Sequence, residues 1–351
     1  MNHAIHEAMP PVSSRIAISA LDADERAQVL SLYARVFGSV LPVSKWQSLF
    51  ERNPFSPAIV YVAKTTGGQV VGHYAVIPQP LRLAGQEALG ALAVHLMVHP
   101  SFQRQGILKA LALAVERRMQ MDGIDVGMTF LNDNSVHAHT RHFGWSRLGG
   151  HNPIFFKVLR WASLFAFGRR TARAFDDPRR AGATIREVDA LDERVDALWE
   201  GMASHVGVAV ERSARYLNWR LAPGRDRYRI HIAEDASKRL TGVVVTKKER
   251  RFGVEVGFLV ELLFAVDDED TGVALARYAQ ARLIAEGCAM ATALTAGSPA
   301  VERALRRTGF RRLPRRLMPH GIHFCFKGVG LRSGAPGPAP WFLSWLDHDV
   351  V

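Results

Sequence analysis

The apolar positions in the first half of the chain switch between helix-like and strand-like spacing. Apolar residues recur at helical intervals over residues 22–37 and again over residues 107–119. Short apolar runs typical of strands occupy residues 59–63, 70–77, 91–98 and 126–131. A short helix ending at Phe143-Gly144-Trp145 follows the last of them. This order predicts an α/β unit in which strands alternate with helices.

The second half repeats the later part of this order. We expect a strand at residues 258–266, a helix around residues 275–283, a strand at residues 290–295, and a short helix that begins at Ser298-Pro299. The two halves close with similar segments, HFGWSRL and RTGFRRL. The repeat predicts an internal duplication. The predicted domains are residues 1–160 and 184–328, joined by an arginine-rich linker at 161–183 and followed by a tail at 329–351.

Composition is consistent with two packed domains. The chain has 351 residues, 48% of them hydrophobic, which is enough for two cores. Its two cysteines, Cys288 and Cys325, lie far apart in sequence, which argues against a disulfide framework and a thiolate zinc site. The N-terminus lacks a basic start followed by an apolar core, and no apolar run is long enough to span a bilayer. We therefore expect a cytoplasmic protein.

The net charge of +12 favours anionic partners. It does not distinguish among nucleic acid, anionic lipid, acidic glycans and a polyphosphate cofactor. The dense arginines from Arg306 to Arg316 form no recognised nucleic-acid-binding motif and no interleaved aromatic platform, which argues against nucleic-acid binding. Short aromatic segments at residues 161–167 and 341–346 could dock on a membrane surface, although packing against the protein body accounts for them better.

The connection between the strand at 91–98 and the helix that follows it carries the clearest chemical signal. Gln103, Arg104, Gln105 and Gly106 open directly into that helix. The first amides of a helix lack internal partners and face the positive end of its dipole. Gly106 leaves the backbone open, and Arg104 adds positive charge. These features predict a phosphate-binding loop, whereas an ordinary turn glycine is the alternative.

The spacing of Val98, Pro100, Gln103 and Gly106 resembles motif A of the GNAT acetyltransferases, with Leu108 at a position where that family has Gly or Ala. Residues 36–54, 132–145 and 216–228 are similar to segments of a two-domain GNAT subgroup. The resemblance implies an α/β (α+β) fold class with tandem GNAT-like folds. Each copy would be a mixed central sheet flanked by helices, the second copy being degenerate.

The same resemblance implies an acyl-CoA site. The strand around Met97 and Val98 would be splayed so that its backbone pairs with pantetheine, and the Val98 amide would stabilise the oxyanion. The residues implied in binding the donor are Met97, Val98, Gln103, Arg104, Gln105, Gly106, Ile107, Leu108 and Asn134. Acetyl-CoA would serve as co-substrate, and a primary amine of a small molecule would attack it directly in a ternary complex. An amino sugar is one candidate acceptor.

The acid or base is the least defined part of this site. Thr140 stands where many GNAT enzymes place a tyrosine, so His95 and His139 are the candidate catalytic residues beside it. His137 and His142 are further candidates, and all of these histidines could instead be core or solvated residues. His139 and His142 have helical spacing but no third ligand, so no metal is expected.

The second half is expected not to bind CoA. Acidic residues at 267–270 replace the loop of the first half and would repel pyrophosphate. Two alternatives to acetyl transfer remain: a non-catalytic acyl-CoA-binding or scaffolding protein, and a FemAB-like aminoacyl or long-chain acyl transferase. The sequence does not indicate the oligomeric state.

Overall fold

The protein is described by a computed structural model covering residues 16–149, 153–160, 184–251, 253–317, 321–330 and 340–348. The described residues belong to two compact units. Unit 1 is drawn from Met1–Gln79, Ala88–Leu148 and Ile322–Gly337, and unit 2 from Pro80–Glu87, Gly149–Gly321 and Pro338–Val351. The predicted linker at residues 161–183 lies outside the described residues. No helix in the described ranges is long and apolar enough to cross a membrane.

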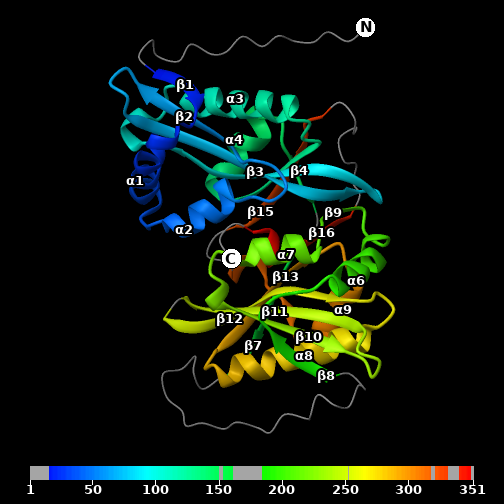
Figure 1. The fold of residues 1–351 in the computed structure, drawn as a ribbon. Helices are drawn as coiled ribbons and strands as arrows, with labels where there is room; N and C mark the ends of the chain where they lie inside the picture. Colours follow the sequence, from blue (N-terminus) through cyan, green and yellow to red (C-terminus); the bar gives the residue numbers. More distant parts are fainter. Residues whose placement is uncertain are drawn as a thin grey trace. The chain divides into compact units, whose positions relative to one another are not determined.

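Unit 1 is a mixed sheet with helices on both faces (Figure 1). In chain order its elements are β1 (Ile16–Ala20), α1 (Arg26–Phe37), α2 (Val43–Trp46), β2 (Ile59–Thr65), β3 (Val70–Leu83), β4 (Gln86–Val98), α3 (Ile107–Met121), β5 (Val126–Leu131), α4 (Asp133–His142) and β6 (Ser146–Arg147). The strand order is β1-β2-β3-β4-β5-β15-β6, where β15 (His323–Gly328) comes from the far end of the chain.

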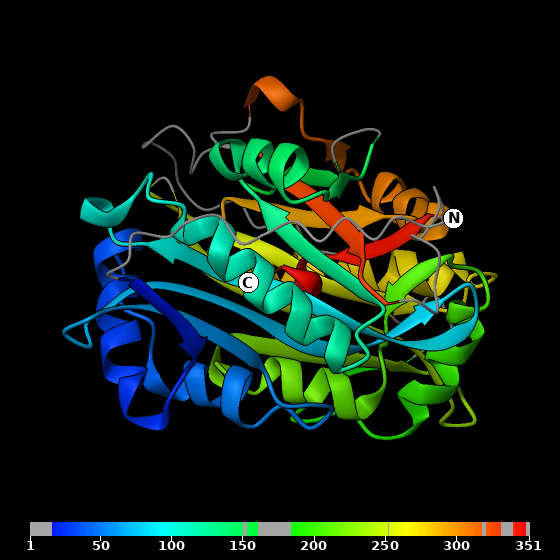
Figure 2. The ribbon, with the colours of Figure 1, turned by 90° about the horizontal axis from the view of Figure 1, so that it is seen from above.

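The core of unit 1 lies between the sheet and α3, which crosses one face of the strands, whereas α1 and α2 lie on the opposite face (Figures 1 and 2). The helix contributes Ile107, Leu111, Val115 and Met119, which recur at the spacing that places them on one side. Buried side chains of β2, β3, β4 and β5 pack with these residues of α3. This packing fixes the helix so that its first turn lies at one edge of the sheet.

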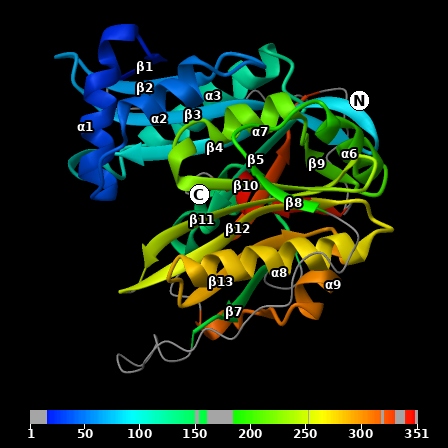
Figure 3. The same cartoon turned by 60° about the horizontal axis from the view of Figure 1, so that its bottom comes forward.

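Unit 2 has a similar order of elements, with one additional short strand, β9, between its first two helices. It runs β8 (Thr184–Val188), α6 (Arg194–Ala203), β9 (Val208–Val210), α7 (Ala214–Leu221), β10 (Tyr228–Glu234), β11 (Leu240–Arg251), β12 (Val254–Phe264), α8 (Glu269–Ala285), β13 (Met290–Ala296), α9 (Pro299–Arg307) and β14 (Arg311–Arg312). Its strands are ordered β8-β10-β11-β12-β13-β7-β14, with β7 (Ile154–Val158) taken from the end of the first half. Figure 3 shows α8 running along one face of this sheet.

Each half of the sequence therefore supplies one strand to the other unit. β7 pairs with β13 and β14, and β15 pairs with β5 and β6, all antiparallel. The domain boundaries expected from sequence assign β7 to the first domain and β15 to the second. The structure instead places β7 in unit 2 and β15 in unit 1. Local pattern identifies a strand, but its partner depends on contacts distant in sequence. The predicted α/β class, with a mixed central sheet flanked by helices, is confirmed.

Candidate functional site

The loop between β4 and α3 is an exposed segment with two left-handed residues. Arg104 has φ +61° and Gly106, the N-cap of α3, has φ +76°. Residues 103–106 are all exposed, and a Cβ placed on Gly106 would meet no atom within 4 Å. The carbonyl of Gly106 already accepts the first helical bond, from the Ala110 amide at 3.0 Å. The open space thus adjoins the helix amides that have no partner within the helix, and this arrangement suits a phosphate.

Gly72 on β3 lets the start of α3 sit close to the sheet. A Cβ at this position would lie 3.0 Å from Ala63 Cβ, Ile107 Cγ2 and Leu111 Cδ1. Real side chains rarely approach so closely, so the helix rests where a hydrogen atom is the only side chain below it. Ile107 is 1% exposed, and the loop that precedes it takes its position from this contact.

We therefore expect Gly72→Val to lower the free energy of unfolding by about 1–3 kcal/mol, because a larger side chain must displace Ile107 and Leu111. Urea denaturation measures this loss. Gly67→Val is the control, because a Cβ there would meet Thr65 Oγ1 only at 3.8 Å. Equal losses in the two variants would show that Gly72 does not set the position of the helix.

The parallel strands β4 and β5 separate before they end. Their paired residues run from Gly90 opposite Val126 to Leu92 opposite Met128, although β4 continues to Val98 and β5 to Leu131. Beyond the last pair, the buried Thr129 hydroxyl donates to the carbonyl of Ala93 at 3.0 Å. Met97 and Val98 lie in the separated part of β4, where peptide groups can serve a ligand instead of β5.

α4 starts at the same edge of the sheet as α3, because the carboxyl ends of parallel strands share one edge. Its N-cap Asn132 accepts a hydrogen bond from the Ser135 amide at 2.9 Å, and Asn134 is exposed in its first turn. The residues from Gln103 to Leu108 and Asn134 are therefore placed at one edge, on either side of the gap between β4 and β5. Whether they bind CoA stays a prediction.

His139 and Thr140 occupy α4 in positions that engage the helix itself. His139 is 3% exposed, its Nδ1 donates to the Ser135 carbonyl at 2.9 Å, and its ring contacts Phe143 and Trp145 edge-on. Burial lowers the pKa of His139 below its ordinary value. The Thr140 hydroxyl donates to the Val136 carbonyl at 2.9 Å. Both residues remain candidates, but these contacts describe a packing role for His139.

His95 lies in a group of aromatic rings on the face of the sheet opposite α3. Its ring centroid is 5.0 Å from that of Tyr33 and 5.7 Å from that of Phe50. His95 has φ +52°, a conformation that L residues seldom adopt. Its carbonyl accepts a hydrogen bond from Nδ1 of His73, on β3, at 2.9 Å.

Two histidines that sequence reasoning missed lie near these elements. His73 is 0% exposed, and desolvation by burial lowers its pKa to about 3, so the ring is neutral in the folded protein. His323 on β15 is 2.7 Å from Asp133 Oδ1 in the first turn of α4. His73 could have been found from the sequence, because it is the lone polar residue in the apolar run VVGHYAVI. His323 and Asp133 are far apart in the chain, so no local pattern links them. Among the described residues, no group of three His, Cys, Asp or Glu side chains could hold a metal.

The corresponding edge of unit 2 is built differently. Asp268 caps α8, accepting from the Thr271 amide and hydroxyl, and Glu269 pairs with Arg303 and Arg307. β12 and β13 also separate, after Leu259 opposite Ala293. β16 (Trp341–Ser344) then pairs with the end of β13, with Ser344 opposite Thr295.

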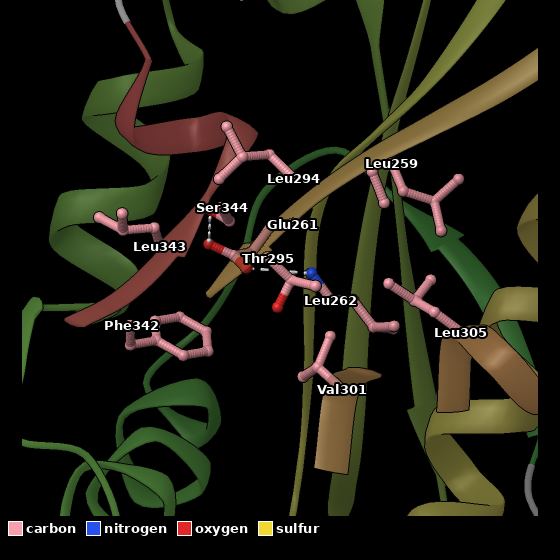
Figure 4. Close-up of a pocket in the computed structure, with 11 residues that line it drawn as sticks. Leu259, Glu261, Leu262, Leu294, Thr295, Val301, Leu305, Phe342, Leu343 and Ser344 are labelled. Carbon is pink, nitrogen blue, oxygen red and sulfur yellow. Dashed lines mark hydrogen bonds between the residues drawn. The ribbon is translucent and has the colours of Figure 1, made fainter. Parts of the chain in front are cut away.

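Figure 4 shows how closely this second gap is filled. Phe342, Leu343 and Ser344 lie beside Glu261 and Thr295, and the enclosed space among them is about 10 Å³. That volume is on the order of one water molecule. Carboxylates at the start of α8 and a strand in the gap leave no cradle like that of unit 1.

Part of the chain is similar to a known protein family. Residues 17–147 match the family model described as acetyltransferase (GNAT) domain. No curated protein matches the chain. The fold is also similar to that of several solved structures, at sequence identities that are too low to show more than a shared fold. A probable N-acyltransferase from Enterococcus faecalis has 14% identity and a TM-score of 0.60, over 90% of this chain and 73% of that one.

Saccharomyces cerevisiae N-myristoyltransferase with bound myristoyl-CoA has 12% identity and a TM-score of 0.61, over 92% of this chain and 85% of that one. A GCN5-related N-acetyltransferase from Kribbella flavida has 15% identity and a TM-score of 0.59, over 89% and 71%. Residues 17–147 are thus similar to a GNAT acetyltransferase domain, and the chain shares the fold of these solved structures.

Proposed function

We propose that unit 1 binds acyl-CoA at the β4–α3 loop and transfers the acyl group to a primary amine. The observation that carries the proposal is the loop itself, which has two left-handed residues, open space at Gly106 and free helix amides. The CoA pyrophosphate would lie against residues 103–108, and pantetheine would enter between β4 and β5. Met97, Val98 and Asn134 would line its path.

In the proposed reaction the amine attacks the thioester carbonyl while both substrates are bound. A carbon–nitrogen bond forms and the carbon–sulfur bond breaks, and the amine loses a proton as the CoA thiolate gains one. The Val98 amide would stabilise the oxyanion. Among the candidate bases, we favour His95, because it lies on the part of β4 that has separated from β5.

The first experiment is a calorimetric titration of the protein with acetyl-CoA. We expect one site per chain and at least about tenfold weaker binding for Gly106→Asp, a loss of about 1.4 kcal/mol or more. The new carboxylate would repel pyrophosphate and occupy the open space. Gly123→Asp is the control, since Gly123 has φ +72°, meets no atom within 4 Å, and follows the opposite end of α3. Equal weakening in both variants would contradict the site.

The length of the acyl chain separates two candidate donors. Acetyl-CoA is the donor we propose, and the fold shared with an N-myristoyltransferase makes a long-chain acyl-CoA the second candidate. Parallel titrations with acetyl-CoA and myristoyl-CoA rank them. Release of free CoA thiol that requires an added amine would establish turnover, and binding without such release would favour the non-catalytic alternative.

A further inference from the structure

β4 contains an irregularity at His95 that the alternation of its side chains reveals. Ala91 and Ala93 pack in the core against α3, as alternate residues of a strand should. Unbroken alternation would place His95 on that face too, yet its ring contacts Tyr33 and Phe50, and Val98 has joined the core instead. The alternation is therefore shifted by one residue, as it is at a β-bulge, and His95 with φ +52° lies where the shift occurs.

This bulge lies between the last residues paired with β5 and the residues proposed to hold acyl-CoA. Pairing with β5 reaches Leu92, and Met97 and Val98 follow the bulge. A one-residue shift turns the later peptide groups relative to the earlier ones. The direction in which the Met97 and Val98 peptides point thus depends on whether the bulge holds its conformation.

The His73 imidazole is bonded to the bulged residue itself. Its Nδ1–H donates to the His95 carbonyl at 2.9 Å. Within the described residues, its Nε2 is buried and has no hydrogen-bond partner, so the bond to His95 is the hydrogen bond that orients the ring, beside its packing against Trp46. Leaving one nitrogen of a buried imidazole without a hydrogen-bond partner costs free energy. A protein keeps such a group where it has a functional role.

We propose that His73 is a positioning residue: by holding the His95 carbonyl it fixes the bulge that presents the β4 peptides of Met97 and Val98 to acyl-CoA. This inference rests on the proposed function. His73 does not touch the reacting atoms. Burial keeps the ring neutral, so it carries a single proton, and the bond to the His95 carbonyl places that proton on Nδ1.

Three substitutions at His73 separate this role from simple packing. His73→Asn keeps an N–H at the position of Nδ1, His73→Leu removes the donor, and His73→Gln moves it one bond farther away. We expect Asn to bind acetyl-CoA within about twofold of wild type, and Leu and Gln to bind about tenfold more weakly, near 1.4 kcal/mol. Equal affinity of the Asn and Gln variants would overturn the proposal even if the Leu variant fails to fold.

Hydrogen exchange of the peptide covering residues 93–99 tests the bulge without acyl-CoA. Exchange should speed up in His73→Gln and His73→Leu and stay near wild type in His73→Asn. His231→Leu, which removes a buried histidine of unit 2, should leave both exchange in this peptide and acetyl-CoA affinity unchanged. Altered exchange with no binding by wild type would refute the proposed function and retain the role of His73 in the bulge. Unaltered exchange in every variant would refute that role.

Discussion

Arg212→Met is expected to lower the free energy of unfolding by about 3–5 kcal/mol. The guanidinium is 0% exposed, with Nε 2.7 Å from Glu261 Oε2 and Nη2 2.6 Å from Asp347 Oδ2. Both carboxylates are also buried, so removing the arginine leaves two like charges in an apolar interior. Burial already raises the pKa of Glu261, which shows how unfavourable its charge is there. Urea denaturation monitored by circular dichroism measures the loss.

Arg303→Met provides the matched control. Its guanidinium is 57% exposed and lies 2.7 Å from Glu269, so its loss should cost less than about 1 kcal/mol. The contrast also tests how the C-terminal segment is held, because Asp347 and Ser344 both bond to this cluster. Similar losses in the two arginine variants would show that the buried cluster does not hold β16 in place.

Lowering the pH from 7 to 4 is expected to destabilise the protein through its buried histidines. Burial lowers the pKa of His73 to about 3 and that of His231 to about 4, against an ordinary value of 6.5. Between those values and 6.5, the unfolded chain binds protons that the folded protein excludes. The stability that these neutral rings allow is complete above pH 6.5. It then falls by about 1.4 kcal/mol per pH unit for each histidine as the pH decreases.

Urea denaturation at pH 7, 6, 5 and 4 measures this slope. His73→Asn removes one titrating ring and keeps the hydrogen bond, so its slope between pH 6 and 4 should be shallower by about 1.4 kcal/mol per pH unit. Parallel curves for wild type and His73→Asn would contradict a depressed pKa for His73. Below pH 4, carboxylates such as Glu234, whose pKa its bonds to Arg186 and Arg194 lower to about 2, add to the loss.

Most elements follow from local pattern, and their limits show where that pattern stops. The expected helix at residues 22–37 corresponds to a short 3₁₀ turn and α1, and the expected helix at 107–119 to α3. The strands expected at 70–77 and 91–98 are longer, because β3 and β4 continue into a tight turn at Ala84-Gly85, both with positive φ. Pro78 and Pro80 argue against such an extension in the sequence, because proline has no backbone N–H to donate to a neighbouring strand.

The sequence by itself determined the order of the main helices and strands between residues 22 and 145 and from residue 258 onward, the β4–α3 loop, and the acidic start of α8. Each of these depends on residues within a few positions of one another, through side-chain periodicity and helix capping. The tertiary structure alone decided that β7 pairs within unit 2 and β15 within unit 1, and that β16 fills the gap beside β13. It also decided that α3 packs closely over Gly72 and that His73 bonds to His95. These features join residues distant in the chain, and their partners are chosen by packing and burial, which local pattern does not encode.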